Sequence, residues 1–229
     1  IMRPYSWEHY ISYVLCTRSI STHIYGASPG RYYAKLFKPL TPKKVQVFLQ
    51  HGITKEPIPL RGYSDWVMVA SATEAQYFAK SGHKRPDKIL EAGFCRYDNL
   101  TDISKEQKQK IILIMPTFRS WLGGHTTVQE KVFLGSNYYK KWHSLLNNSD
   151  LVSWVEKNNY RVIFYPHRQM QAFAKLFTTS SRNVKVAVQS DYDVQDLLRR
   201  SSLLVTDYSS VFYDFSYMKK PVIFYPFDK

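Results

Sequence analysis

A stretch near the C-terminus, residues 203–215, has the residue types of an anion site. The apolar run Leu203–Val205 is followed by the polar turn Thr206–Ser210 and then by a segment with helical spacing. The first N–H groups of a helix lack partners and lie at the positive end of its dipole, so they bind phosphate together with nearby hydroxyls. We therefore expect Ser209 and Ser210 to contact a phosphate. The simpler alternative is that Ser209 only caps the helix.

Three further apolar runs end in polar or cationic side chains. In chain order these ends are Gln50-His51-Gly52, Thr117-Phe118-Arg119 and Pro166-His167-Arg168. Ligands of open parallel sheets gather outside the C-terminal ends of the strands, so these groups are expected at ligand-binding edges. A single histidine in such a place more often has a structural role, but that role does not account for several converging donors.

The chemistry of these groups fits a pyrophosphate that is bound without a metal ion. Arg119, His167 and Arg168 supply donors, and the helix start supplies fixed partial charge. His51, followed by Gly52, is suited to act as a general base on an acceptor hydroxyl near neutral pH. The sequence has neither GxGxxG nor a Walker-type phosphate loop, which argues against ATP hydrolysis and dinucleotide redox chemistry. We expect a diphosphate-linked donor, with no metal ion and no cofactor.

The order of the apolar runs predicts an α/β protein with parallel strands. Strands that alternate with helices pair in parallel through right-handed crossovers. The first half is expected to hold strands at Val45–Leu49, Trp66–Ala70 and Ile89–Glu91. The second half is expected to hold five, at Lys110–Met115, Tyr160–Tyr165, Val184–Val188, Ser202–Val205 and Pro221–Tyr225.

Three helices are indicated by capping residues and by apolar spacing. Ser71-Ala72-Thr73-Glu74 is a capping box that precedes a helix with Phe78 on its apolar face. Asp193 is placed to cap a second helix, in which Leu197 and Leu198 share a face. In the third, Val211, Phe215 and Met218 share a face and follow the two serines.

The chain has the size and composition of a two-domain globular protein. Its 229 residues are 44% hydrophobic and 16% aromatic, enough for a sizeable core. The polar stretch 101–109 is expected to separate an N-terminal domain, residues 1–105, from a C-terminal domain, residues 106–229. Neither end has the pattern of a natural end, so we expect the chain to be cut from a longer protein on both sides.

Charge and cysteine content narrow the range of partners. Lys and Arg number 32 against 18 Asp and Glu, a formal net charge of +14, which attracts polyanions, anionic lipid or nucleotides. Cys16 and Cys95 belong to no Cys/His cluster, so neither a disulfide framework nor a zinc site is indicated. The longest apolar runs are far below the roughly 20 residues of a membrane span, and the start is no secretory signal.

Taken together and in order, the motifs resemble those of the CDP-glycerol glycerophosphotransferases, the teichoic-acid polymerases and primases to which capsule polymerases are related. The resemblance runs from about His51 to the last residue, and residues 1–44 contribute little. It is carried by Gln50-His51-Gly52, Gly93–Asp98, Pro116–Arg119, Tyr165–His167, Thr206–Ser210, Asp214-Phe215 and Lys220-Pro221.

The resemblance implies a GT-B fold, in which two Rossmann-like domains with parallel sheets face a cleft. It also implies transfer of glycerol phosphate, or a related polyol phosphate, from CDP-glycerol to a hydroxyl of a teichoic-acid-like or capsular polymer, without a required metal. The first domain would then hold the acceptor side and the second domain the CDP donor.

The same resemblance assigns roles to individual residues. His51 matches the catalytic base, and His167 matches a histidine near the donor phosphates that assists the leaving group. The CDP and pyrophosphate positions are expected to be Arg119, Arg168, Thr206, Asp207, Ser209 and Ser210, of which Asp207 orients the turn. Gln50 stands where the family commonly has Trp, a departure on the acceptor side.

The expected partners are a CDP-glycerol or CDP-polyol donor and a lipid-linked polyol-phosphate or glycan acceptor. The acceptor would lie at the anionic inner face of the cell membrane, so we expect a cytoplasmic protein bound peripherally there. Lys105–Lys110 and Lys140–Lys141 are candidate contact clusters, although for either cluster taken singly a solvated helix face is the favoured interpretation.

Two alternatives stay open at this point. One is a GT-B glycosyltransferase that uses a nucleotide sugar, and the other is a non-catalytic module that binds a polyanion or a membrane. The basic clusters lack the aromatic interleaving of RNA-binding motifs, so nucleic acid is not an expected partner. The sequence leaves open glycerol or ribitol as the polyol, and a primase or a polymerase as the activity.

Overall fold

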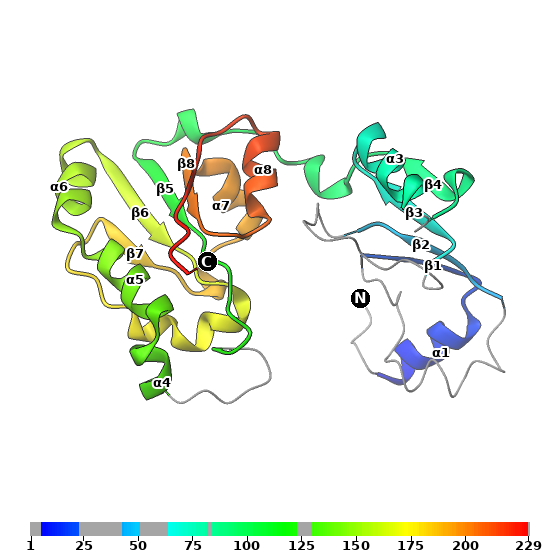
Figure 1. The fold of residues 1–229 in the computed structure, drawn as a ribbon, viewed down its shortest axis with the longest axis horizontal. Helices are drawn as coiled ribbons and strands as arrows, with labels where there is room; N and C mark the ends of the chain where they lie inside the picture. Colours follow the sequence, from blue (N-terminus) through cyan, green and yellow to red (C-terminus); the bar gives the residue numbers. More distant parts are fainter. Residues whose placement is uncertain (1–5, 23–42, 51–63, 82–83, 123–129, 229) are drawn as a thin grey trace. The chain divides into compact units, whose positions relative to one another are not determined.

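A computed structural model describes residues 6–22, 43–50, 64–81, 84–122 and 130–228. The chain forms two compact units, Ile1–Asp98 and Asn99–Lys229, and each contains its own parallel sheet (Figure 1). The division falls before the expected boundary at residues 105 and 106. The reason is that the segment after Asn99 is bonded to the second unit: the Ile103 amide donates to the Arg199 carbonyl at 3.1 Å.

The first unit has a four-stranded parallel sheet in the order β1-β2-β3-β4. Its helices are α1 (Trp7–Leu15) and α3 (Ala72–Lys80), and its strands are β1 (Arg18–Ser21), β2 (Val45–Phe48), β3 (Trp66–Val69) and β4 (Ile89–Glu91). The three strands expected from the sequence are confirmed. The strand β1 was not expected, because its four residues include a single apolar one, Ile20, and so form no apolar run.

The capping box before α3 is confirmed, with one difference in its reciprocal bond. The Ser71 hydroxyl accepts from the Glu74 amide at 3.3 Å, as the motif requires. The Glu74 carboxylate, however, accepts from the amide of Ala70 at 2.7 Å, one residue before the cap. Phe78, on the inner face of α3, packs with Phe48 and the valines of β3 in the core of this unit.

The second unit has a five-stranded parallel sheet whose order, β7-β6-β5-β8-β9, is the Rossmann order 3-2-1-4-5 in chain numbering. The strands are β5 (Lys110–Ile114), β6 (Tyr160–Phe164), β7 (Val184–Val186), β8 (Leu203–Thr206) and β9 (Val222–Phe224). The helices are α4 (Glu130–Gly135), α5 (Asn137–Leu146), α6 (Ser149–Lys157), α7 (Val194–Arg200) and α8 (Val211–Tyr217). All five expected strands are confirmed, and the order reverses between β5 and β8.

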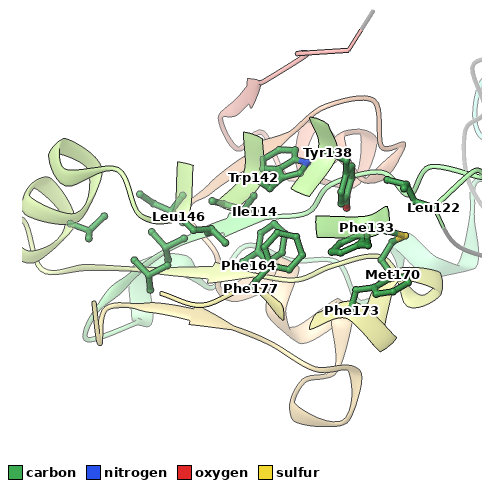
Figure 2. Close-up of a cluster of buried hydrophobic side chains, with 14 residues drawn as sticks. Ile114, Leu122, Phe133, Tyr138, Trp142, Leu146, Phe164, Met170, Phe173 and Phe177 are labelled. Atoms are coloured by element: carbon green, nitrogen blue, oxygen red, sulfur yellow. The ribbon is translucent and has the colours of Figure 1, made fainter. Parts of the chain in front are cut away.

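The core of the second unit is a cluster of buried side chains from β5, β6, α5 and neighbouring segments (Figure 2). Tyr138, Trp142 and Leu146 recur every four residues on the buried face of α5 and pack against the sheet. Phe133 stacks on Phe173, with ring centroids 4.2 Å apart and an interplanar angle of 7°. Burial of each large apolar side chain contributes about 1.5–3 kcal/mol to the free energy of folding, so this core stabilises the packing of α5 on the sheet.

The two helices expected in the second unit are also confirmed. The Asp193 carboxylate caps α7 by accepting from the Asp196 amide at 2.8 Å, and Leu197 and Leu198 are buried. Val211 and Phe215 are buried on α8. Within the described ranges, no helix is long and apolar enough to cross a membrane.

Candidate active site

The expected phosphate-binding groups gather at the strand-order reversal of the second sheet. Arg119 lies five residues after the end of β5, and Asp207 directly follows β8, the neighbouring strand. His167 follows β6, on the other side of β5. Because these strands are parallel, their C-terminal ends share one edge, which is where ligands bind in Rossmann-like sheets. His51 and Gly52 lie outside the described residues.

Asp207 joins the segments that follow β5 and β8. It is 2% exposed, and its Oδ1 accepts from the amides of Thr117 at 2.8 Å and of Tyr208 at 2.6 Å. The hydroxyl of Thr206, itself fully buried, donates to the carbonyl of Met115 at 2.7 Å. Both side chains therefore hold the turn after β8 against the segment that follows β5.

Arg119 is buried, and protein carboxylates and a carbonyl bind its guanidinium. Nη2 lies 2.8 Å from Asp207 Oδ2 and 2.7 Å from Asp228 Oδ1. Nε donates to the second oxygen of Asp228 at 2.8 Å, and Nη1 donates to the Thr117 carbonyl at 2.8 Å. Burial disfavours the charge, but hydrogen bonds to Asp228 and Asp207 and their charges outweigh it and raise the pKa of Arg119.

This arrangement differs from a guanidinium that is open to a phosphate. A single cation faces two carboxylates, so most of its N–H donors are already used by protein acceptors. Asp228 was not among the expected site residues. No sequence pattern pointed to it, because the burial of Arg119, which calls for an anionic partner, is visible only in the fold.

His167 presents one ring nitrogen as a donor. Its ring stacks on Phe118 with centroids 4.7 Å apart at 25°, and its Nδ1 accepts from the Gln169 amide at 3.3 Å. Since Nδ1 accepts, the neutral ring carries its proton on Nε2. Although the residue is exposed at the surface, desolvation of the ring lowers the pKa of His167, which favours that neutral form. Arg168, the next residue, is exposed.

The two serines at the start of α8 are weakly engaged in capping. Ser210 occupies the N-cap position but makes no side-chain capping bond. The Ser209 hydroxyl accepts from the Val211 amide at 3.5 Å, a contact at the limit of hydrogen bonding. Helix capping therefore does not explain why two serines occur here. Both hydroxyls lie at the positive end of the helix dipole.

Two buried polar atoms near Arg119 lack hydrogen-bond partners among the residues that the structure describes. These atoms are the hydroxyls of Thr117 and Tyr138. The guanidinium carbon of Arg119 lies 5.5 Å from the Tyr138 ring centroid, and burial raises the pKa of this tyrosine. Buried polar groups are normally satisfied, so such atoms mark places where a ligand or water completes the bonding. No sequence pattern singled out Tyr138.

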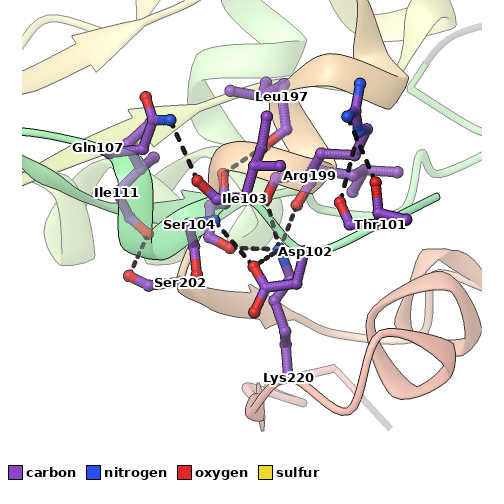
Figure 3. Close-up of polar contacts among 12 residues, drawn as sticks. Thr101, Asp102, Ile103, Ser104, Gln107, Ile111, Leu197, Arg199, Ser202 and Lys220 are labelled. Atoms are coloured by element: carbon purple, nitrogen blue, oxygen red, sulfur yellow. Dashed lines mark hydrogen bonds and ion pairs between the residues drawn. The ribbon is translucent and has the colours of Figure 1, made fainter. Parts of the chain in front are cut away.

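Lys220, which belongs to the Lys-Pro motif, has a structural position (Figure 3). Its buried Nζ donates to the carbonyls of Leu198, Arg199 and Ser201 at 2.7, 2.9 and 2.6 Å, at the end of α7. Burial lowers the pKa of Lys220, opposed by the charge of Asp102, which lies 3.3 Å away. The ammonium thus satisfies carbonyls at the negative end of the helix dipole.

A sequence model of the family described as CDP-glycerol:poly(glycerophosphate) glycerophosphotransferase matches residues 47–229. This match covers the whole second unit and part of the first, and it confirms the family indicated by the motifs.

Curated relatives agree with the family model. The minor teichoic acid biosynthesis protein GgaB of Bacillus subtilis (strain 168) is 33% identical, over 99% of this chain and 26% of that protein. The teichoic acid ribitol-phosphate polymerase TarK of Staphylococcus aureus (strain NCTC 8325 / PS 47) is 30% identical, over 70% of this chain and 31% of that protein. A teichoic acid glycerol-phosphate primase of Bacillus subtilis (strain 168) is 28% identical, over 72% and 40%. The chain therefore spans less than half the length of these relatives.

Solved structures share the fold. The wall teichoic acid polymerase TagF superposes with a TM-score of 0.59 at 18% identity, over 91% of this chain and 54% of that chain. The UDP-GlcNAc 2-epimerase from Neisseria meningitidis, bound to UDP-GlcNAc, gives 0.51 at 15% identity, over 86% and 57%. These likenesses confirm the α/β, GT-B-like class with parallel sheets.

Proposed function

Because the chain belongs to the CDP-glycerol:poly(glycerophosphate) glycerophosphotransferase family, we propose that it takes part in moving a polyol phosphate from a CDP-linked donor to a polymer hydroxyl. The observation that supports this most is the edge between β5 and β8. There a Rossmann-order sheet brings Arg119, His167 and the start of α8 to the position where such sheets bind nucleotides. The polymer would be of the teichoic-acid or capsular kind, since the curated relatives are named for teichoic acid synthesis.

The transfer is a displacement at the phosphorus of the polyol phosphate. The acceptor hydroxyl oxygen forms a bond to that phosphorus, and the bond to the bridging oxygen of the pyrophosphate breaks. CMP leaves with the electron pair, and the hydroxyl proton passes to a base, for which we propose His51. Charge develops on the bridging oxygen and the phosphate oxygens as the bond breaks, so fixed donors there lower the barrier.

The second unit offers donors of the right kind for this charge. We propose that His167 Nε2–H donates to the leaving phosphate, that Arg168 neutralises the pyrophosphate, and that Ser209 and Ser210 bind it at the start of α8. Arg119 would exchange Asp228 for a phosphate oxygen when the donor binds. Thr206 and Asp207 would support the pyrophosphate site indirectly, through the hydrogen bonds that hold the turn after β8 in place.

We further propose that the acceptor is lipid-linked and that the protein acts peripherally at the anionic inner face of the membrane. The support is the net charge of +14, which attracts both anionic lipid and a polyanionic acceptor. The curated relatives include ribitol-phosphate and glycerol-phosphate enzymes, so either polyol fits the donor site proposed here.

The decisive experiment uses the full-length protein with a lipid-linked acceptor and measures CMP release and product length. CDP-glycerol and CDP-ribitol are compared with UDP-GlcNAc, and we expect transfer from a CDP-polyol only. His51→Ala should abolish transfer while CDP binding persists, because the base touches the acceptor and not the nucleotide. Wild-type transfer in that variant would refute the assignment of the base, and turnover of UDP-GlcNAc alone would refute the proposed donor.

A further inference from the structure

A pocket lies at the end of the second unit's sheet that is opposite the candidate active site. Its volume is about 470 Å³, and its lining includes Gln107, Lys108, Gln109, Arg161 and Arg200. The strands β5 and β6 begin here, at Lys110 and Tyr160, whereas the candidate active site lies where they end. The pocket is therefore separated from the active site by the length of the strands.

The segment that forms one wall of this pocket is fixed to its surroundings (Figure 3). Gln107 donates to the Ile103 carbonyl at 3.2 Å, and the Ile103 amide donates to the Arg199 carbonyl. Gln109 donates to the Tyr160 carbonyl, also at 3.2 Å. These bonds tie the wall to α7 and β6, so the pocket is preformed.

The charges around the pocket are mainly positive. Lys108, Arg161 and Arg200 line it together with one acidic residue, Glu106. Asp196 pairs with Arg200 at 2.7 Å, so Lys108 and Arg161 contribute most of the excess. Lys105 and Lys110, on the same segment of the chain, add further positive charge. An anion is therefore attracted to the pocket.

Arg161 gives the pocket a specific binding group. Its Nε is buried and has no hydrogen-bond partner among the residues that the structure describes. A buried N–H without an acceptor carries a desolvation cost that an oxyanion would remove. A guanidinium also binds the paired oxygens of a phosphate in a bidentate manner.

We propose that this pocket binds a phosphodiester of the growing polymer, at a distance from the active site. A phosphodiester carries one negative charge per unit, which matches the modest charge excess of the pocket. That the phosphodiester belongs to the polymer rests on the proposed function, in which the polymer is the acceptor. Bound there, a chain that already carries several units would be retained by the protein between transfers.

The test measures binding of a fluorescent, short poly(glycerol phosphate) chain to the full-length protein by anisotropy, with CDP present to occupy the donor site. We expect binding in the wild type and a loss of about tenfold in Arg161→Gln, the size of one charge-assisted hydrogen bond. Lys108→Gln, at an exposed position, should weaken binding by a few-fold without affecting the fold. The matched control is Arg182→Gln, an exposed arginine before β7 that does not line the pocket, and it should bind as the wild type does.

Wild-type affinity in both Arg161→Gln and Lys108→Gln would overturn the proposal, as would absence of binding in the wild type. Phosphatidylglycerol vesicles form a second arm: binding of vesicles that depends on Arg161, with no binding of the polymer, would overturn it in favour of a lipid headgroup. Transfer from the CDP donor onto a single-unit acceptor is measured in parallel. Transfer without polymer binding contradicts only the pocket, and polymer binding without transfer contradicts only the proposed function.

Discussion

At the candidate site, the carboxylates of Asp207 and Asp228 both bind the guanidinium of Arg119. A ligand anion would compete with these carboxylates for the guanidinium. Asp207 is almost fully buried and also accepts two amides, so it is fixed in place. Asp228 is more accessible, with 17% of its side chain exposed, and within the described part of the chain both of its carboxylate oxygens bond to Arg119. We therefore expect a phosphate to displace Asp228 at a smaller cost than Asp207.

A first prediction concerns Asp228. In Asp228→Asn the competing charge is removed while Asp207 still holds Arg119, so we expect CDP-glycerol to bind several-fold more tightly. Isothermal titration with the full-length protein measures the dissociation constant. The control is Asp87→Asn, which removes the carboxylate of an exposed pair with Arg85 and should leave the dissociation constant unchanged. Weaker binding in Asp228→Asn would show that the carboxylate supports donor binding instead of competing with it.

At the scale of elements, the end of α7 depends on a side chain that lies twenty residues further along the chain. Lys220 donates to three carbonyls there and lies beside Asp102, so one ammonium connects α7, the segment before β9 and the segment after Asn99. The resemblance placed Lys220 in a family motif, and the structure gives that motif a physical role in packing.

A second prediction follows for Lys220→Met. The substitution keeps the apolar stem but leaves buried carbonyls without a donor, so we expect a loss of about 2–4 kcal/mol in the free energy of unfolding of the second unit. Urea denaturation measures this loss. Lys219→Met changes an exposed neighbour and should stay within about 0.5 kcal/mol of the wild type. Equal stability of the two variants would contradict the capping role.

At the scale of the whole molecule, each unit has its own sheet and its own apolar core. The described part of the first core is built around Phe48 and Phe78, and the larger second core around Trp142 and Phe164. Domains with their own cores could in principle fold alone, so we expect each unit to unfold in a separate cooperative transition.

A third prediction tests this independence by calorimetry. Trp142→Ala should cost about 3–5 kcal/mol, lowering the melting temperature of the second unit by about 10 °C or more while the first transition stays in place. Phe48→Ala should lower the melting temperature of the first unit and leave the transition of the second unit in place. A single transition that both variants shift to the same extent would show that the two units unfold together.

Apolar periodicity and capping are local properties, so the residue pattern predicted eight of the described strands, three of the helices and the motifs at strand ends. The helices α1, α5 and α6 were not expected, although each has a side-chain cap. The sequence also indicated the family, which the comparison with known proteins confirms. The short strand β1 was missed, because pairing with β2 stabilises it and its own residues do not. The roles of His51 and the facing of the two units across a cleft stay predictions.

Which strand ends meet and which charges pair depends on how the chain packs. The order β7-β6-β5-β8-β9 brings Asp207 to the amide of Thr117, ninety residues earlier in the chain. The same packing brings Arg119 into an ion pair with Asp228 and places the Lys220 ammonium against carbonyls at the end of α7. A buried charge pairs with an opposite charge or a polar group that packing brings close in space, and the spacing of residues along the sequence does not show which groups will be close.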